Sequence, residues 1–433
     1  IVFTIYNIVM SKTGVQKNYL GPFLTMVFLF FIVGFLTTAN TQFQGPLKAA
    51  FLSEAGNLKN TMATLITFSW FLAYPVFGNV GSRLVVSSGY KGTLVRGLAM
   101  MIGGIVLLAL SSWVTTSFPT ADMAVGDGTV NIGFFVFLLG SFVVGGSVTV
   151  LQVVINPYLT ACEVHGTQGV QRMAIGGTFN SIGTTIAPYF VTGIVFGGLS
   201  MSEVSVAQLL VPFLLLAFVL IAVAVIVTRL HLPDLDNTHT SEGERLERSP
   251  WSFRHLALGV VAIFFYVGCE VCIGANINLY ALADGGSDVT SAMLMATLYW
   301  GGLLIGRLAG SFFKSISART QLTFTTSAAA LLVAVSVALD SPWVLVSVGL
   351  MHSIMWGAIF TLAVARLGKY TSVASGVFMV GVLGGAVLPL LQGVVADAMG
   401  LWRWSWLIVI VGELCMLAYA RIGCRLRNVD IVE

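Results

Sequence analysis

Long apolar stretches follow one another along almost the whole chain, and they limit its fold more than any other feature of the sequence. A helix needs about 20 apolar residues to cross the hydrocarbon core of a bilayer. Within lipid, every backbone N–H and C=O must be paired inside a helix or a closed barrel. Because the apolar residues here run continuously instead of alternating with polar ones, the pattern predicts helices. The chain is therefore predicted to be an all-α integral membrane protein.

Composition supports this prediction and excludes several classes of protein. Of the 433 residues, 57% are apolar and 9% are charged, whereas a soluble globular chain carries roughly 25% charged residues. So few charges cannot coat a water-soluble protein of this size, and a net charge of +3 forms no patch that follows a nucleic-acid backbone. The sequence therefore excludes a soluble enzyme, a disordered regulator and a nucleic-acid partner.

Twelve membrane spans are predicted, and the basic residues orient them. The spans cover residues 20–44, 61–83, 93–113, 131–158, 172–197, 206–230, 255–282, 290–314, 321–339, 342–365, 373–397 and 402–424. With both termini in the cytoplasm, only Lys48, Lys59 and Arg403 lie outside, which leaves 18 of the 21 basic residues inside. This bias agrees with the positive-inside rule. We expect a multi-pass protein of a cell membrane, specifically a bacterial inner membrane.

A hydrophilic stretch between spans six and seven divides the chain into two halves. The predicted parts are a cytoplasmic N-terminal segment at 1–19, a six-helix half at 20–230, a cytoplasmic linker at 231–254, a second six-helix half at 255–424 and a C-terminal tail at 425–433. Met10 and the residues after it are typical of a chain start, so residues 1–9 are left out of the fold. No cleaved signal peptide is expected, because many more apolar stretches follow the first.

A short repeat links the two halves. Gly183 and Pro188 lie five residues apart in span five, and Gly384 and Pro389 lie five apart in span eleven. Together with the central linker, this spacing indicates a 6+6 duplication, which is the plan of many secondary transporters.

Glu270 is the most informative polar residue, because it lies within span seven. A charged side chain at membrane depth is costly and usually faces a cavity or a partner helix. No Lys or Arg lies within one or two helical turns of it along the sequence. Glu270 is therefore a candidate proton carrier, cation ligand or acceptor for sugar hydroxyls. The alternative is a neutral acid that only locks helices together.

Amide side chains inside the spans form a second group of candidates. They are Asn40 and Gln44 in span one, Gln152 and Asn156 in span four, Asn180 in span five and Asn276 in span seven. Amides offer both donors and acceptors to a neutral, hydroxyl-rich ligand. One amide alone is equally well explained by a bond between helices, but the whole group predicts a shared polar cavity.

Two tryptophans complete this predicted cavity, Trp300 in span eight and Trp356 in span ten. Either ring suits stacking on the apolar face of a sugar, with packing inside the protein as the alternative. Two more acids lie in or near spans. Asp397 is expected to be structural because it lies near a span end, and the role of Glu413 stays open.

Enzyme and metal motifs are missing from the sequence. There is no H-E-x-x-H, no Walker loop and no G-x-S-x-G. Cys269 and Cys272 form a C-x-x-C inside an apolar run, without a His or a second pair at zinc-site spacing, and are interpreted as packing residues. The chain is predicted not to be an enzyme and to hold no metal or cofactor. Transport would be driven by a gradient or be passive.

Several strings resemble the sugar permeases of the major facilitator superfamily, in particular its fucose/galactose/glucose branch. They are Leu151-Gln152-Val153-Val154-Ile155-Asn156-Pro157-Tyr158, residues 178–188, residues 266–274 and Gly306-Arg307-Leu308-Ala309-Gly310-Ser311. The resemblance implies the major facilitator fold and a hexose transporter that is coupled to a cation and works by alternating access. It also places Asn180 at a position linked to sugar binding in the family.

Departures from the family pattern limit what the resemblance implies. The fucose permeases carry an acid at the position of Gln152 and another in span one, where this chain has Asn40, Thr41 and Gln42. Both differences argue against fucose and against the same proton route, so coupling would pass to Glu270, with sodium or a proton as the ion. Changes after Gly274 and around Trp356 leave room for a different hexose or an N-acetyl sugar.

We therefore predict a monomeric importer of a neutral hexose, glucose or galactose, by symport with sodium or a proton. The predicted sugar-binding residues are Gln152, Asn156, Asn180, Asn40, Gln44, Asn276, Trp300 and Trp356, with Glu270 as the ion-coupling residue. The alternatives are a transporter of fucose or an N-acetyl amino sugar, a drug or organic-anion exporter and a non-transporting sugar sensor. No basic residue is expected deep in a span, which weakens the anion alternative.

Overall fold

The computed structural model describes residues 19–162, 164, 169–197, 203–230, 232, 247–283, 286–310, 316–367 and 370–427. The helices of the first half are α2 (Leu20–Gln42), α3 (Gln44–Phe51), α4 (Lys59–Ser117), α5 (Ile132–Ala161), α6 (Gly169–Tyr189) and α7 (Leu210–Arg229). Its short elements are the 3₁₀ turns η1 (Gly56–Leu58) and η3 (Val206–Leu209), the π turn η2 (Phe190–Val195) and the strands β1 (Asp122–Val125) and β2 (Gly128–Asn131).

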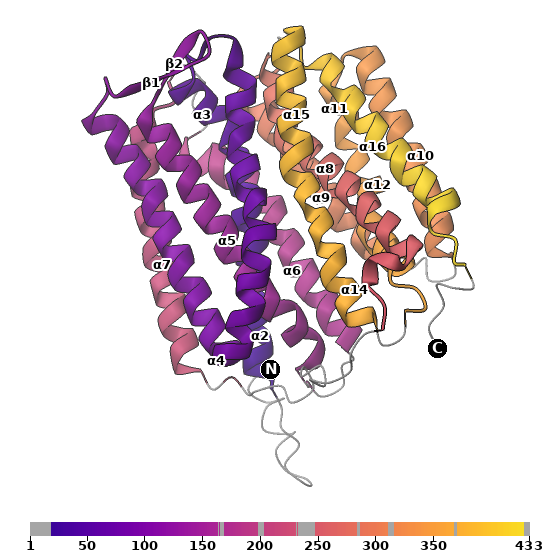
Figure 1. Cartoon of the computed structure of the whole chain (residues 1–433). Coiled ribbons are helices and arrows are strands. Elements are labelled where there is room, and N and C mark those ends of the chain that lie inside the picture. The colour runs from indigo at the N-terminus through magenta and orange to yellow at the C-terminus, as the bar shows by residue number, and fades with distance from the viewer. Residues whose placement is uncertain are drawn as a thin grey trace.

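The second half lies beside the first in Figure 1, coloured from red to yellow. Its helices are α8 (Arg254–Ala283), α9 (Val289–Gly310), α10 (Ala318–Leu339), α11 (Pro342–Val346), α12 (Val348–His352), α13 (Met355–Ala363), α14 (Thr371–Phe378), α15 (Gly384–Met399) and α16 (Leu407–Ala418). Its short elements are the 3₁₀ turns η5 (Pro250–Ser252), η7 (Met379–Leu383) and η8 (Arg403–Trp406) and the π turn η9 (Tyr419–Gly423).

These helices account for the twelve predicted spans, and the predicted fold is confirmed. Ten helical segments of the described chain are long and apolar enough to cross a membrane. An eleventh span consists of α11 and α12 followed by α13, with a bend of 42° that the sequence did not predict. The remaining span, span five, consists of α6 and η2. Its apolar residues are interrupted by Thr178, Asn180 and Ser181, because one face of this helix lines the cavity described below.

Spans two and three are joined within α4, without a regular loop between them. Gly89 has φ 65° and ψ 178° at the junction. This conformation is costly for any residue with a Cβ and is open to glycine. A single glycine therefore permits the tight reversal between the two spans.

Glycines also allow the same close packing in both halves. A Cβ added at Gly183 of α6 would overlap the carbonyl oxygen of Phe31 in α2, and one at Gly384 of α15 would overlap that of Phe264 in α8. Span five thus packs against span one as span eleven packs against span seven. The repeated glycines of the sequence hold equivalent places in the two halves.

A hairpin that the sequence did not predict connects α4 to α5. Its strands β1 and β2 pair in antiparallel fashion. Asp127 in its turn accepts hydrogen bonds of 3.0 and 2.9 Å from the backbone N and the Nδ2 of Asn57. The Asn131 side chain then caps α5 by accepting a bond of 3.0 Å from the backbone N of Gly133. The hairpin therefore fixes both the start of α5 and the loop before α4.

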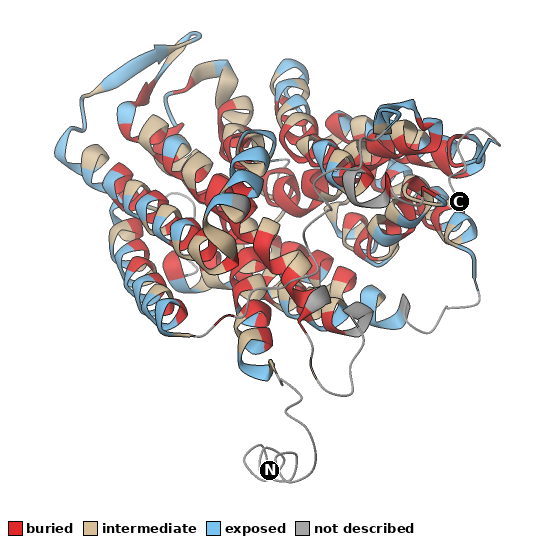
Figure 2. Cartoon of the chain, turned by 60° about the horizontal axis from the view of Figure 1, so that its bottom comes forward, coloured by how far each residue is buried: buried red, intermediate tan, exposed pale blue. Residues whose placement is uncertain are grey.

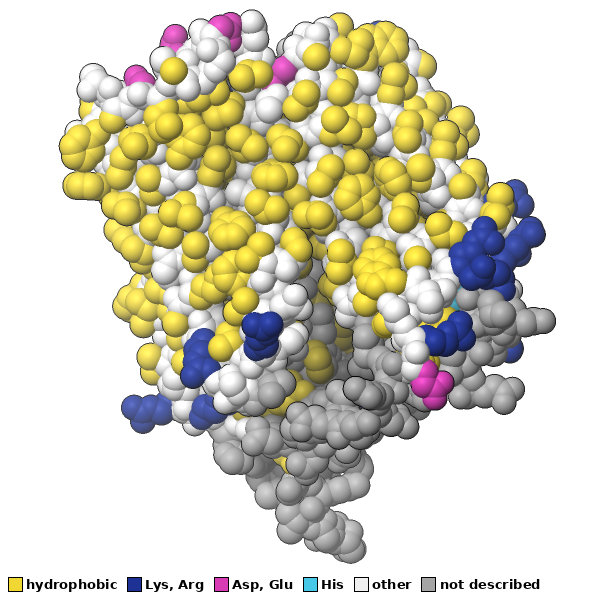
Figure 3. All heavy atoms as spheres, viewed as in Figure 1, with side chains coloured by type: hydrophobic (Ala, Val, Ile, Leu, Met, Phe, Trp, Pro, Cys, Tyr) yellow, Lys and Arg dark blue, Asp and Glu magenta, His cyan; other side chains and the backbone are white. Residues whose placement is uncertain are grey.

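The two ends of the molecule differ in charge. The hairpin end is the end that carries β1 and β2. The basic end is the opposite one, where α4 reverses at Gly89 and α7 and η9 finish, and it carries Arg83, Lys91, Arg96, Arg229, Arg254, Arg319, Arg421 and Arg425. Figure 3 shows the Lys and Arg side chains gathered toward this end, below a broad apolar band.

The outer faces of the helices are apolar and exposed. In α7, for example, Val211, Leu215, Phe218 and Ile226 are all exposed. Figure 2 shows buried residues on the inward faces of the helices and exposed ones on the outward faces. A water-soluble monomer rarely exposes so much contiguous apolar surface. This surface suits lipid, and the chain is a multi-pass membrane protein.

Candidate functional site

A cavity of about 760 Å³ lies between the two halves of the molecule. Its wall is built by α2, α4, α5 and α6 from the first half and mainly by α8, α9, α10 and α13 from the second. Ile316, just before α10, and Ala318 and Gln321, at its start, belong to the wall, so the cavity extends to the basic end. Figure 3 shows the corresponding hollow between the halves at that end.

The first half lines the cavity with amides and hydroxyls. Gln152 and Asn156 lie one turn apart in α5, and Asn180 lies in α6. Gln152 Nε2 donates a hydrogen bond of 3.0 Å to the hydroxyl of Tyr74 in α4. Asn180 Nδ2 donates one of 2.9 Å to the carbonyl oxygen of Phe30 in α2. These bonds hold the two amides in place at the cavity wall.

Two tryptophans of the second half give the cavity flat apolar surfaces. Trp300 packs on Gly274, where any Cβ would overlap the indole ring. The Trp300 side chain is buried, and its Nε1–H has no hydrogen-bond acceptor among the described residues. The Trp356 ring stacks on Phe360 with the centroids 5.4 Å apart. Both tryptophans line the cavity, as the sequence predicts.

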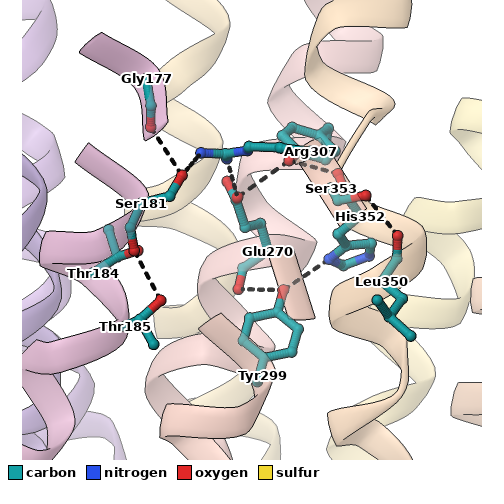
Figure 4. A network of polar contacts seen from close by, with 11 residues as sticks. Gly177, Ser181, Thr184, Thr185, Glu270, Tyr299, Arg307, Leu350, His352 and Ser353 are labelled. Atoms are coloured by element: carbon teal, nitrogen blue, oxygen red, sulfur yellow. Dashed lines mark hydrogen bonds and ion pairs between the residues drawn. The ribbon is translucent and has the colours of Figure 1, made fainter. Parts of the chain in front are cut away.

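Glu270 lines the same cavity and is held by contacts to its own helix α8 and to α9. Arg307 Nη2 of α9 lies 3.7 Å from Glu270 Oε1, and the Tyr266 hydroxyl donates a hydrogen bond of 3.1 Å to the same oxygen. The Tyr299 hydroxyl donates one of 3.1 Å to the Glu270 carbonyl oxygen. Figure 4 shows Arg307 between Glu270 and Ser181 of α6, whose Oγ accepts a bond of 2.6 Å from Arg307 Nη1.

A second acid lies behind Glu270. His352 Nε2 of α12 is 2.7 Å from Glu413 Oε1 of α16, and both side chains are 0% exposed. His352 Nδ1 is 2.8 Å from the hydroxyl of Tyr299, which also contacts the backbone of Glu270. Glu413 Oε2 has no hydrogen-bond partner in the described part of the chain. The sequence left the role of Glu413 open, and the structure places it in the packing of the second half.

Three predicted sugar-binding residues do not line the cavity. Each is hydrogen-bonded to a side chain of another helix: Asn40 to Ser141, Gln44 to Thr67 and Asn276 to Gln392. In this conformation they connect helices, which is the alternative that the sequence allows for any single amide. Their role in sugar binding stays a prediction.

Contacts between the halves close the cavity at the hairpin end. Gln42 Nε2 of α2 donates a hydrogen bond of 2.9 Å to the carbonyl oxygen of Gly274 in α8. Asp397 of α15 accepts bonds of 2.6 Å from both the backbone N and the hydroxyl of Thr61, and one of 3.1 Å from the backbone N of Asn60. A carboxylate at the N-terminus of a helix is electrostatically favourable. Asp397 therefore ties span eleven to the start of span two.

Arg307 is a cavity residue that the sequence did not indicate. It belongs to the last turn of α9, so the sequence suggested an ordinary basic residue at the end of a span. The sequence predicts no basic residue deep in a span, and Arg307 lies near the end of one, but its side chain still lines the cavity beside Glu270. The cation that pairs with Glu270 comes from another helix, so spacing along α8 could not reveal it. Glu270 and Arg307 are the charged residues of the described lining, and their charges cancel.

His352 is another interior residue that was not predicted from the sequence. A single histidine within the apolar span ten was the available signal. Among the described residues, no three His, Cys, Asp or Glu side chains come together as a metal site would require. Cys269 and Cys272 are both buried among apolar side chains.

Comparison with known proteins places this architecture in a family. The model of the Major Facilitator Superfamily matches residues 30–387. The glucose/galactose transporter of Brucella abortus biovar 1 (strain 9-941) is 32% identical over 424 residues, which cover 96% of this chain and 97% of that protein. The L-fucose-proton symporter of Escherichia coli (strain K12) is 24% identical over 430 residues, which cover 91% of each chain.

A solved structure shows the same fold at lower identity. It is a bacterial homologue of the human lysosomal transporter Spinster, in an inward-facing and occupied conformation, with 14% identity and a TM-score of 0.68. The likeness covers 97% of this chain and 100% of that one. From these matches, the chain belongs to the Major Facilitator Superfamily and, within it, to the fucose/galactose/glucose branch.

Proposed function

We propose that the chain imports a neutral hexose, glucose or galactose, by symport with a cation. The observation that carries this proposal is the cavity between the halves, where amides, hydroxyls and two tryptophans surround a pair of opposite charges. Amide and indole groups hydrogen-bond sugar hydroxyls, and a flat ring suits the apolar face of a hexose. The cavity of about 760 Å³ lies within the range of roughly 300–1,000 Å³ that is typical of small-molecule sites.

The charge balance of the cavity favours a neutral substrate over a sugar acid. A carboxylate-bearing sugar needs a cation that is not already engaged, and Arg307 lies 3.7 Å from Glu270. The names of two relatives support the same substrate class, one being a glucose/galactose transporter and the other an L-fucose-proton symporter. Gln152 stands where the fucose permeases carry an acid, so we place this chain with the glucose/galactose members.

The charge distribution also supports an orientation and a conformation. Lys and Arg accumulate on the cytoplasmic side of membrane proteins, so we assign the basic end to the cytoplasm, with both termini inside. The cavity then opens inward, and the contacts of Asp397 and Gln42 close it toward the outside. In alternating access these contacts break while the basic end closes. Because the cavity lies between the two halves of a single chain, we propose that the protein works as a monomer.

Within this cycle each wall of the cavity has a task. Gln152, Asn156 and Asn180 would bind the sugar hydroxyls from the first half, and Trp300 or Trp356 would stack on the ring from the second. Glu270 would bind the coupling ion, sodium or a proton. Since the two sets of residues belong to different halves, a bound sugar connects the halves and favours their closure around it.

Uptake of radiolabelled glucose into proteoliposomes tests the proposal. The purified chain is compared under an imposed sodium gradient, an imposed pH gradient and no gradient. Accumulation under one gradient alone would identify both the symport and its ion. Competition by unlabelled galactose, fucose and N-acetylglucosamine separates the alternative substrates. No uptake of glucose or galactose by folded protein under any gradient would exclude the proposed substrate.

A further inference from the structure

At the boundary between the halves, Arg307 interacts both with Glu270 of the second half and with Ser181 of the first. These two interactions point to a role in transport as well as in packing. We propose that Arg307 is a built-in counter-cation, which occupies Glu270 whenever the coupling ion is absent and leaves it when the ion binds. This inference rests on the proposed cation symport. It adds a coupling residue whose position in the sequence gave no indication of that role.

The geometry is that of a contact that can be exchanged. Arg307 Nη2 lies 3.7 Å from Glu270 Oε1, whereas a charge-assisted hydrogen bond measures about 2.7–2.9 Å. The attraction is therefore electrostatic, without a tight bidentate bond. The Arg307 side chain is 37% exposed and that of Glu270 is 14% exposed, so an ion arriving through the cavity can reach the carboxylate. Glu270 keeps a second contact, the hydroxyl of Tyr266, when the arginine departs.

No other described group around Glu270 offers the same compensation. The titratable neighbours are Tyr266 in its own helix, Tyr299 and Arg307 in α9 and His352 in α12, with Glu413 of α16 behind the histidine. The first half adds Tyr74 as the titratable residue of its lining. His352 lies against Glu413 at 2.7 Å and contacts Glu270 only through the tyrosines. Arg307 is therefore the cation that neutralises Glu270.

Neutralisation matters because the carrier has to return empty after it releases sugar and ion. During the return the halves close around the cavity, and a lone carboxylate would lose its water without gaining a partner. Removing one partner of a buried ion pair is strongly unfavourable, since it leaves an uncompensated charge. With Arg307 on Glu270, the empty carrier crosses with no net charge in its cavity.

The same guanidinium also contacts the opposite half. Arg307 Nη1 donates a hydrogen bond of 2.6 Å to Ser181 Oγ in α6, and Ser181 in turn donates one of 3.0 Å to the Gly177 carbonyl oxygen (Figure 4). Arg307 thus connects the ion site of one half to a cavity helix of the other. Its release by the coupling ion would loosen both contacts at once.

Net uptake and exchange are two transport modes whose comparison distinguishes a counter-cation role of Arg307 from a role in sugar binding. Net uptake requires the empty carrier to return, while exchange of labelled for unlabelled sugar, with saturating coupling ion on both sides, uses the loaded carrier alone. In Arg307→Gln, net uptake under the driving gradient should fall by about tenfold or more, because the empty form now carries an uncompensated charge. Exchange should stay within about twofold of the unmodified chain. Arg307→Lys, which keeps the charge, should recover part of the net uptake.

A double variant and a matched control complete the experiment. Glu270→Gln/Arg307→Gln removes both charges, so downhill net uptake should return but no longer depend on the ion gradient. The control is Arg254→Gln at the exposed start of α8, which should behave as the unmodified chain. Equal loss of exchange and net uptake in folded Arg307→Gln, or no loss of either, would overturn the inference. If the unmodified chain accumulates no sugar under any gradient, the proposed function fails, and the inference fails with it.

Discussion

Trp300 presents a buried donor to the cavity, and this single atom gives a sharp test of sugar binding. Its indole Nε1–H has no acceptor among the described residues, while its ring packs on Gly274. A sugar hydroxyl would supply the acceptor. One hydrogen bond contributes about 1 kcal/mol net, so Trp300→Phe, which keeps an aromatic ring, should raise KM for glucose about fivefold.

Uptake kinetics of the purified variant in proteoliposomes measure this effect. The matched control is Trp343→Phe, because Trp343 is an exposed tryptophan at the start of α11, away from the cavity lining. An unchanged KM in Trp300→Phe, with the control also unchanged, would contradict a hydrogen bond from Trp300 to the sugar.

The His352–Glu413 pair is a stability element of the second half. Both side chains are 0% exposed and 2.7 Å apart. In Glu413→Ala the histidine loses its partner in an apolar interior, which should cost about 3 kcal/mol of unfolding free energy. Thermal unfolding in detergent should show a clearly lower midpoint, with Glu413→Gln intermediate because its amide still bonds to His352. Glu54→Ala, at an exposed site, is the control, and equal midpoints for Glu413→Ala and this control would refute the assignment.

Residues of the site differ in how far the sequence could reveal them. Gln152, Asn156 and Asn180 could be predicted, because an amide within an apolar span must face a cavity or another helix. That same rule could not distinguish them from Asn40, which bonds to Ser141 instead. Arg307 could not be found, since a contact between helices depends on their packing and leaves no mark in the spacing of one helix.

Helix α2 packs against α6 so closely that a glycine is required between them. A Cβ added at Gly34 would overlap the backbone oxygen and the amide of Asn180. Gly34→Ala should therefore separate the two helices or displace Asn180. Overpacking typically costs about 1–3 kcal/mol, and the displaced amide should also raise KM for sugar.

Thermal unfolding and uptake kinetics measure the two effects of Gly34→Ala separately. Gly78→Ala in α4 is a suitable control, because a Cβ there would meet nothing within 4 Å. If Gly34→Ala keeps both the unfolding midpoint and the KM of the control, the close approach of α2 and α6 has no role in the site.

The sequence predicts a helix correctly where its apolar length alone determines it. It fails where contacts between residues distant in sequence determine the shape of the element. In the described part of the chain, ten spans are long and apolar enough for hydropathy to find them. The bend of 42° in span ten begins after His352, whose side chain is tied to α16 through Glu413 and to α9 through Tyr299. Such a bend depends on partners that are distant in sequence. The hairpin of β1 and β2 escaped prediction because it is short and half exposed.

Across the whole molecule, the two halves meet at the hairpin end and part around the cavity at the basic end. Span eleven contacts the start of span two through Asp397, which accepts hydrogen bonds from Thr61 and Asn60. Span one contacts span seven through Gln42 and Gly274. The proposed alternating access would require all these bonds to break in every cycle, so they would have to be replaceable by water and could not be covalent.

A reversible crosslink at this contact tests that requirement for the whole molecule. Thr61 Oγ1 and Asp397 Oδ2 are 2.6 Å apart, so cysteines in Thr61→Cys/Asp397→Cys should crosslink with an oxidant or a short bifunctional thiol reagent. The disulfide should reduce net uptake by about tenfold or more, because the outward-open state becomes inaccessible. Sugar binding from the basic end should persist, and a reductant should restore uptake of the disulfide form.

Each single cysteine variant, treated in the same way, controls for chemical damage. Transport by the crosslinked chain at the rate of the reduced chain would show that the halves do not separate at the hairpin end, and alternating access through this cavity would have to be abandoned.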